Sequence, residues 1–331
     1  MAFRATLVSH EPLDYFMKRY DDTSRMRISD VVLRVNKDPK KLFPHLIRLA
    51  TQSQWSHSAL LYLISDPHKG YENTFLVDAM TSGIRVESWR KEVVPYNRFT
   101  VGIKRPCLDW YVETPKEQAE HDRDDPEDVK GIAFLRHVRG IAFDQIDGMY
   151  DHKVVAELTA RYIDRILKKR LPDSSVLAEG AEKAADLFKK WDESSSNRQN
   201  VMRFICSGLV QYAFFEALRV QLIHDFAIPA HREAATSNLQ NMTHIIYRED
   251  PEQVIPRYIQ QIQSGQLQLS DQPPEDVLDL LKTATPADFG LSDNLAWRYV
   301  ILKGIVWQID RVSDDYQPAS KAESEVLALL K

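Results

Sequence analysis

Cysteine is scarce in this chain of 331 residues, since only Cys107 and Cys206 are present. Two cysteines provide no framework for a small secreted fold held together by disulfides. A chain of this length can bury a sizeable core without such covalent links. We therefore expect each cysteine to have its own explanation, either as a packed side chain or as a reactive thiol.

Several motifs typical of phosphate binding, serine hydrolysis and metal binding are also absent. Glycine accounts for only 11 residues and forms no G-x-G-x-x-G phosphate loop. The G-x-S-x-G elbow of serine hydrolases is also absent, which disfavours that class of enzyme. The sequence has neither C-x-x-C nor H-E-x-x-H, and its ten histidines are scattered. The acidic cluster over 122–128 lacks the turn glycine of a calcium loop and is typical of a solvated surface. We therefore expect no metal and no cofactor.

Long apolar runs are missing as well. No stretch of about 18 apolar residues is present, so we expect no membrane-spanning segment. The first residues lack the apolar segment of a signal peptide. The 43 basic and 48 acidic residues leave a net charge of −5, which disfavours a nucleic-acid partner. These features favour a cytoplasmic protein, although secretion without a signal stays open, and they point to no particular oligomeric state.

The hydrophobic pattern predicts strands first and helices later. Apolar and β-branched runs predict strands at 31–35, 58–64, 75–77, 84–87 and 99–103. Helical crossovers are missing from this run of strands, which favours an antiparallel sheet over a doubly wound parallel one. The remaining expectations are helices at 39–54, 128–141, 153–167, 181–191 and 206–222, a surface loop at 114–128, a helix-bearing insertion with a loop at 249–275, a strand-like run at 297–309 and a weakly ordered tail after 312.

Cys206 lies where a short apolar lead gives way to the amphipathic helix predicted at 206–222. A thiol in the first turn of a helix faces backbone N–H groups that lack partners and the positive end of the helix dipole. Both favour the nucleophilic thiolate, and the same N–H groups can hold an oxyanion. The alternative is a buried, inert cysteine. Cys107 follows Pro106 with no helix start beside it, and we interpret it as structural.

A cysteine nucleophile needs a base, and the base needs a group that orients it. His57 stands at the start of an apolar strand, and Asp78 ends the next one. If these strands are antiparallel neighbours, the carboxylate of Asp78 can reach the far ring nitrogen of His57 and fix its tautomer. Taken alone, His57 is also compatible with a packed histidine and Asp78 with a turn residue at a strand end.

An ordered set of five elements resembles the circularly permuted papain-like fold of the NlpC-type superfamily, in its YiiX/YebB-like branch. In that branch the histidine strand precedes the cysteine helix, as it does here. The resemblance covers roughly 28–105, 128–220 and 284–310. The five elements are Ser56-His57-Ser58, Asp78-Ala79, Gly148-Met149-Tyr150-Asp151, Phe204-Ile205-Cys206-Ser207-Gly208 and Thr285-Pro286-Ala287-Asp288-Phe289.

The chain departs from the pattern of this branch in two site positions. Relatives usually carry Glu at the position of Asp78, so the third side chain is shorter here by one methylene. They usually carry an acidic residue at the position of Gly208. The spacing between Asp78 and Cys206 is also long, and the stretch from 249 to 272 looks inserted. These departures bear on the substrate and the third residue more than on the fold.

The resemblance implies an α+β papain-like fold in which an antiparallel sheet packs against helices, including the cysteine-bearing helix. Length alone favours about two domains. The matching elements instead favour one elaborated domain over 1–331, with a core at about 28–310, a helical insertion at about 110–200, a second insertion at about 249–283 and a tail at 312–331.

The implied activity is a cysteine hydrolase or acyltransferase that cleaves amide or ester bonds through a thioester, with Cys206, His57 and Asp78 as the catalytic residues. The substrate class is a peptide, an isopeptide or a lipid-linked acyl group. Two other readings stay open: a non-catalytic binding or scaffolding protein on the same fold, and a toxin-like effector hydrolase that acts inside another cell.

Overall fold

The computed structural model describes residues 4–18, 26–36, 47–48, 51, 53–63, 71, 74–80, 83–93, 99–121, 129–146, 148–150 and 203–312. The helices predicted at 153–167 and 181–191 and the tail after 312 lie outside the described residues. Of the helix predicted at 39–54, only 47–48 and 51 are described as helical.

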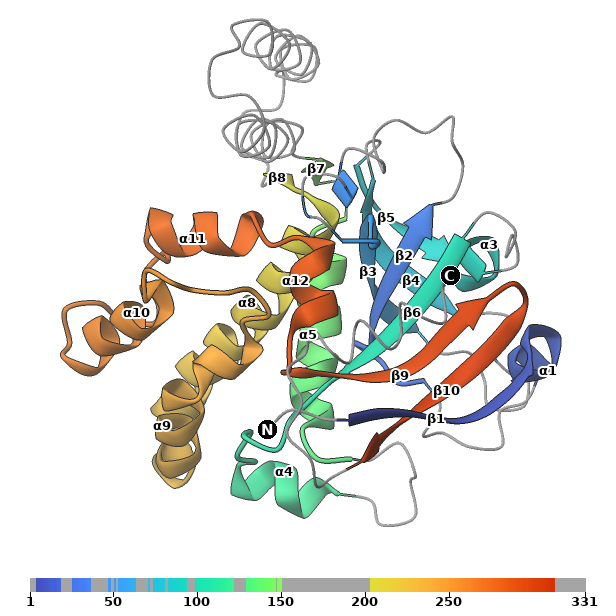
Figure 1. The fold of residues 1–331 in the computed structure, drawn as a ribbon. Coiled ribbons are helices and arrows are strands. Elements are labelled where there is room, and N and C mark those ends of the chain that lie inside the picture. The colour runs from blue at the N-terminus through green and yellow to red at the C-terminus, as the bar shows by residue number, and fades with distance from the viewer. Residues whose placement is uncertain are drawn as a thin grey trace, which may run out of the picture.

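The described fold is α+β and is built on one eight-stranded sheet in which every neighbouring pair is antiparallel (Figure 1). The strand order is β1-β10-β9-β6-β2-β3-β4-β5. The strands are β1 (Arg4–Pro12), β2 (Val31–Asn36), β3 (His57–Leu63), β4 (Phe75–Met80), β5 (Gly83–Ser88), β6 (Phe99–Pro106), β9 (Leu295–Leu302) and β10 (Ile305–Val312). A separate two-stranded parallel pair joins β7 (Met149–Tyr150) to β8 (Arg203–Phe204).

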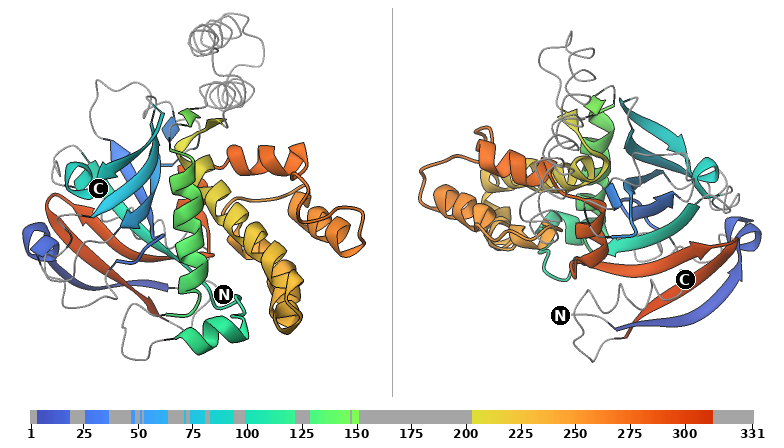
Figure 2. Two further views of the ribbon diagram at one scale, coloured as in Figure 1. Left: turned by 180° about the vertical axis from the view of Figure 1, so that it is seen from behind. Right: turned by 45° about the horizontal axis from the view of Figure 1, so that its top comes forward.

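Most of the described helices gather on one side of this sheet, as both views of Figure 2 show. The longest of them, α8 (Cys206–Ala227), packs against α5 (Ile132–Asp144) and against β3 and β4. The others are α1 (Leu13–Lys18), α3 (Trp89–Val93), α4 (Pro115–Glu120), η2 (Pro229–His231), α9 (Arg232–Gln240), η3 (Met242–Ile245), α10 (Val254–Gln263), α11 (Glu275–Lys282) and α12 (Pro286–Leu291).

The central strands are buried on both faces, which explains why their sequences are continuous apolar runs. Leu60 and Val77 belong to the core between the sheet and α8, together with Phe214 of that helix. Their neighbours Leu61 and Leu76 belong to a second core on the opposite face, which α1 helps to cover. Alternate residues of a strand point to opposite faces, so a strand covered on both sides needs apolar residues throughout.

The strand-like run predicted at 297–309 is a hairpin of two strands. β9 and β10 pair on either side of a two-residue turn made by Lys303 and Gly304, whose φ angles are 51° and 78°. A tight hairpin of this type needs positive φ at both central residues, which glycine adopts without strain. The single Gly304 was therefore the local signal that divides the run.

Two further elements differ from the sequence prediction. The surface loop expected at 114–128 contains a helix, α4, because Thr114 and Glu117 form a reciprocal capping box and Pro115 occupies the first turn. The sequence analysis also predicted no strand before residue 31, whereas β1 pairs with β10 at one edge of the sheet.

A buried lysine ties α12 to the centre of the sheet. Lys104 on β6 is 1% exposed, and its Nζ donates hydrogen bonds of 2.7, 2.9 and 2.9 Å to the carbonyl oxygens of Phe289, Gly290 and Ser292. These carbonyls lie at the C-terminal end of α12, where a cation stabilises the helix. The contact fixes α12, whose first residues carry the Thr285-Pro286 element of the sequence analysis.

Candidate active site

The first residue of α8 is Cys206, and its thiol is buried at the start of the helix. The preceding Ile205 occupies the N-cap with an extended backbone and supplies no capping side chain. Cys206 is 1% exposed and is not in a disulfide with Cys107. The backbone of Ser58, at the start of β3, lowers the pKa of the thiol as a hydrogen-bond partner, and α8 packs on β3. The N-terminus of α8 therefore lies against the beginning of the histidine strand.

His57 and Asp78 meet across two adjacent antiparallel strands, as the sequence analysis expected. β3 and β4 pair so that Asp78 stands opposite Ala59, two residues along from His57 and on the same face. The His57 Nε2 lies 3.2 Å from the Asp78 Oδ2, and the carboxylate is 1% exposed. Asp78 is not the last residue of its strand, because β4 continues to Met80.

The imidazole of His57 also interacts with Cys206. Burial raises the pKa of the Cys206 thiol, but the charge of His57 and a hydrogen bond from it outweigh burial, so that pKa falls below its ordinary value. Burial and the charge of Arg34 lower the pKa of His57, whereas the thiolate and the hydrogen bond to Asp78 raise it, with a net increase. These opposite shifts favour a thiolate–imidazolium pair. Because Asp78 occupies Nε2, Nδ1 is the ring nitrogen left for the thiol.

Asp78 stays ionised despite its burial. Burial raises the pKa of the carboxyl group, but the hydrogen bond and charge of His57, followed by the charges of Arg34 and Arg85, bring it below the ordinary value. Arg85 Nε lies 3.8 Å from the Asp78 Oδ1. An ionised carboxylate at this position accepts the ring N–H and stabilises the imidazolium form of His57.

Arg34 is a residue of this site that the sequence analysis did not single out. It stands directly opposite His57 in the pairing of β2 with β3, and its guanidinium lies 4.8 Å from the centre of the Phe99 ring. Its charge acts on His57, Asp78 and Cys206. A buried charge in the apolar run 31–35 was the available sequence signal, since such residues are rare without a partner.

The glycine that follows the cysteine allows another helix to approach α8. A Cβ on Gly208 would lie 2.4 Å from the backbone oxygen of Lys282, at the end of α11. No side chain fits at that distance from a backbone atom. Glycine at position 208 therefore has a physical reason in this structure, because an acidic side chain there would displace α11.

Two further segments of the five-element resemblance are described in the structure, one close to Cys206 in the chain and one at the start of α12. β7 pairs in parallel with β8, so Tyr150 stands opposite Phe204, two residues before Cys206. Thr285 and Asp288 form a reciprocal capping box at the start of α12, with Pro286 in the first turn. A Thr-Pro-x-Asp sequence is thus sufficiently explained as a helix start.

Among the described residues, one group of three has the composition of a metal site, and it lies away from Cys206. His224, Asp225 and His231 bring one ligand atom each within 4.8 Å of one another near the far end of α8. The sequence analysis named no metal ligand, because the three residues form no familiar short motif.

Comparisons with known proteins leave the family open. No protein-family model matches the chain, and a search of curated proteins finds no significant match. None of the helices in the described parts of the chain combines the length and apolar character needed to cross a membrane.

Proposed function

We propose that this protein is a cysteine-dependent hydrolase or acyltransferase that acts on amide or ester bonds through a thioester on Cys206. The observation that carries the proposal is the position of the His57 ring, which interacts with the Asp78 carboxylate on one side and with the Cys206 thiol on the other. A nucleophile, a base and a group that orients the base are the parts that such chemistry requires.

The thiol proton is already on His57 in the thiolate–imidazolium pair, and the reaction starts from this pair. The thiolate of Cys206 attacks the substrate carbonyl carbon and forms a tetrahedral oxyanion. The backbone N–H of Cys206 and its neighbours in the first turn of α8 are the donors for that oxyanion. The carbonyl re-forms, the bond to the amine or alcohol breaks, and the imidazolium of His57 protonates the leaving group.

The second half of the reaction regenerates the thiol. His57 removes a proton from water, or from another acceptor, as the oxygen or nitrogen attacks the thioester. The carbon–sulfur bond breaks and the acid or transferred acyl product leaves, so that the Cys206 thiolate again lies beside the protonated imidazolium of His57. Asp78 keeps the ring oriented through both halves.

The proposed fold is the permuted papain-like one. Three observations support it: the chain order His57, Asp78, Cys206, the antiparallel pairing of the histidine and aspartate strands, and the position of the cysteine at the start of a helix packed on those strands. On this basis the substrate is a peptide, an isopeptide or a lipid-linked acyl group.

The second candidate is a non-catalytic binding protein on the same fold. Its specific support is the burial of Cys206, which is only 1% exposed. An inert packed cysteine has this burial, but its pKa is raised rather than lowered. The ionisation of Cys206 therefore discriminates between the two candidates.

A substrate panel tests the proposal with the two cysteines as matched variants. Turnover of acyl esters, peptide amides and isopeptides should be abolished in Cys206→Ala and retained in Cys107→Ala, with similar melting temperatures. Turnover by a folded Cys206→Ala protein would exclude the proposed mechanism. If the wild type turns over none of these substrates and the pKa of Cys206 is not lowered, the non-catalytic binding protein is favoured.

A further inference from the structure

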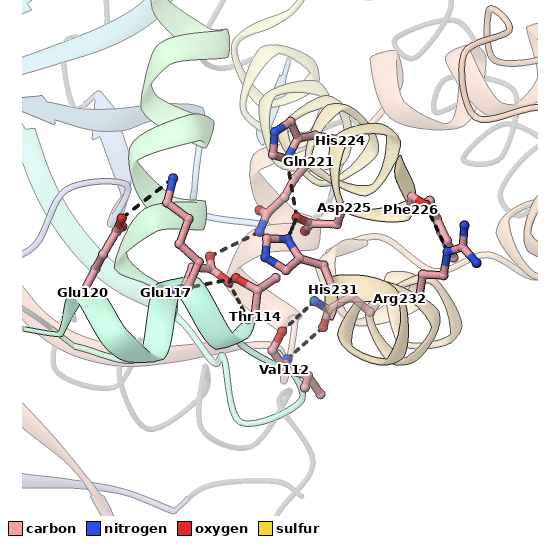
Figure 3. Close-up of polar contacts among 12 residues, drawn as sticks. Val112, Thr114, Glu117, Glu120, Gln221, His224, Asp225, Phe226, His231 and Arg232 are labelled. Atoms are coloured by element: carbon pink, nitrogen blue, oxygen red, sulfur yellow. Dashed lines mark hydrogen bonds and ion pairs between the residues drawn. The ribbon is translucent and has the colours of Figure 1, made fainter. Parts of the chain in front are cut away.

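Two histidines and an aspartate converge where α8 ends. His224 and Asp225 are adjacent in the last turn of α8, and His231 closes the short helix η2 that follows. Both rings are directed at the carboxylate of Asp225 (Figure 3). The group lies 19 residues from Cys206 along the helix, or about 28 Å. It is thus separate from the site of the proposed thiol chemistry.

The distances within the group suit a small metal ion. The Nδ1 atoms of His231 and His224 lie 2.9 and 3.6 Å from the Asp225 Oδ1. Zinc bonds of about 2.0–2.2 Å in a tetrahedral site place ligand atoms about 3.3–3.6 Å apart. The ligand atoms of all three residues lie within 4.8 Å of one another, so the atoms farthest apart must move closer for all three to bind one ion. Two imidazoles and one carboxylate are a common ligand set for zinc, with a fourth position left for water.

A second observation points independently to a missing partner. The other carboxylate oxygen of Asp225, Oδ2, is buried and has no hydrogen-bond donor among the described residues. One turn earlier on α8, Oε1 of the buried Gln221 likewise lacks a donor within the described part of the chain. A buried carboxylate with an unsatisfied oxygen is costly, and a bound cation offsets that cost directly.

The surrounding polar contacts hold this end of α8 firmly. Gln221 Nε2 donates to the Tyr111 hydroxyl and to Glu117 Oε1, and the Tyr111 hydroxyl donates to the same Glu117 oxygen at 2.8 Å. Asn238 of α9 exchanges two hydrogen bonds of 2.8 Å with the backbone of Val112. These contacts are made by neighbours of the three candidate ligands on α8 and α9, so they hold the backbone on which those ligands stand.

We propose that His224, Asp225 and His231 bind one zinc ion through His224 Nδ1, a carboxylate oxygen of Asp225 and His231 Nδ1, with water as the fourth ligand. The ion joins the end of α8 to η2 and so fixes the turn that leads into α9. The competing explanation is a plain buried contact between His231 and Asp225, with His224 as a surface residue that contributes nothing.

The exposed ligand provides a clean test, because the His224 side chain is 70% exposed and its removal leaves the core intact. Zinc is titrated into the full chain without a polyhistidine tag, and both the dissociation constant and the melting temperature are measured. The variants are His224→Ala and His231→Ala. His137→Ala is the matched control, since His137 is an exposed histidine on α5 away from the group.

We expect one zinc per chain, with a rise in melting temperature on binding, in the wild type and in His137→Ala. Loss of an outer contact typically weakens metal binding about 10–100-fold, so loss of the direct ligand His224 should weaken it at least that much. The zinc-dependent rise in melting temperature should vanish in both ligand variants.

Three results would overturn the assignment. They are failure of the wild type to bind zinc, binding that His224→Ala leaves unchanged, and binding that disappears in Cys107→Ala or Cys206→Ala instead. The cysteine variants also keep this test separate from the proposed activity. Zinc binding in an inactive Cys206→Ala protein would still support the metal site.

Discussion

Replacement of His57 by alanine tests the origin of the reactive thiol. In the structure, two influences of His57 lower the pKa of Cys206, its charge and its hydrogen bond, while burial raises it. His57→Ala removes both of these influences, and burial, the largest influence on the thiol pKa, then outweighs the smaller hydrogen bonds of Ser58 and Ser207. The thiol should then ionise no more readily than an ordinary cysteine, whose pKa is 9.0.

The magnitude follows from the fraction of thiolate. At pH 7 a thiol with that ordinary pKa is about 1% ionised, so the thiolate fraction falls about 100-fold if the wild-type thiol is fully ionised. A thiolate of higher pKa is intrinsically more nucleophilic, which reduces the loss to about 10-fold. We therefore expect alkylation of Cys206 by iodoacetamide to fall about 10- to 100-fold at pH 7 in His57→Ala.

The assay follows both cysteines by mass spectrometry of their peptides from pH 4 to 10. Burial of Cys206 slows its absolute rate, so the midpoint of the pH profile is the decisive quantity. We expect a midpoint below 9.0 for Cys206 in the wild type, and an alkaline shift of the Cys206 midpoint in His57→Ala. An unchanged Cys206 midpoint in a folded His57→Ala protein would refute the thiolate–imidazolium pair.

Three further predictions concern the same site and its support. Asp78→Asn should lower kcat about 10²- to 10⁴-fold in a folded protein, because the ring of His57 loses its acceptor, and a loss below tenfold would remove Asp78 from the mechanism. Activity should follow a bell-shaped pH profile. The acid limb should report ionisation of the Cys206 thiol with a pKa below its ordinary value of 9.0. The alkaline limb should report deprotonation of the His57 imidazolium with a pKa above its ordinary value of 6.5. An acid limb above 9.0 would contradict the lowered thiol pKa. Gly208→Ala should destabilise the protein by about 1–3 kcal/mol in urea unfolding, since its Cβ would meet backbone. In the control Gly140→Ala, where the Cβ meets nothing within 4 Å, stability should stay equal or rise by up to about 1 kcal/mol. Equal effects of the two glycine variants would refute the packing argument.

Much of the sheet was predictable from sequence, because its central strands are buried on both faces and are therefore apolar throughout. The runs at 31–35 and 99–103 fall in β2 and β6, and the described part of the run at 58–64 falls in β3. The helix predicted from Cys206 begins at that residue and continues five residues beyond Leu222. Its apolar stripe was a strong signal because most of α8 packs against other elements.

The features that could not be predicted from the sequence depend on contacts between residues far apart in the chain. Among the described strands β1 lies at the edge of the sheet beside β10, and its residues carry little apolar pattern of their own. The hydrogen bond between His57 and Asp78 was foreseeable from two adjacent strands, but their register was not. The group around Asp225 depends on the turn between α8 and η2, and the importance of Gly208 appears only when α11 is placed beside it.

The central claim is that Cys206 carries the acyl group during turnover. The most direct measurement is intact-protein and peptide mass spectrometry after acid quenching of the protein with an activated acyl ester. We predict a mass increase equal to one acyl group, located on the peptide that contains Cys206, removed by hydroxylamine and absent in His57→Ala. An acyl group on Cys107 or any other residue, or ester turnover that never acylates Cys206, would contradict the account.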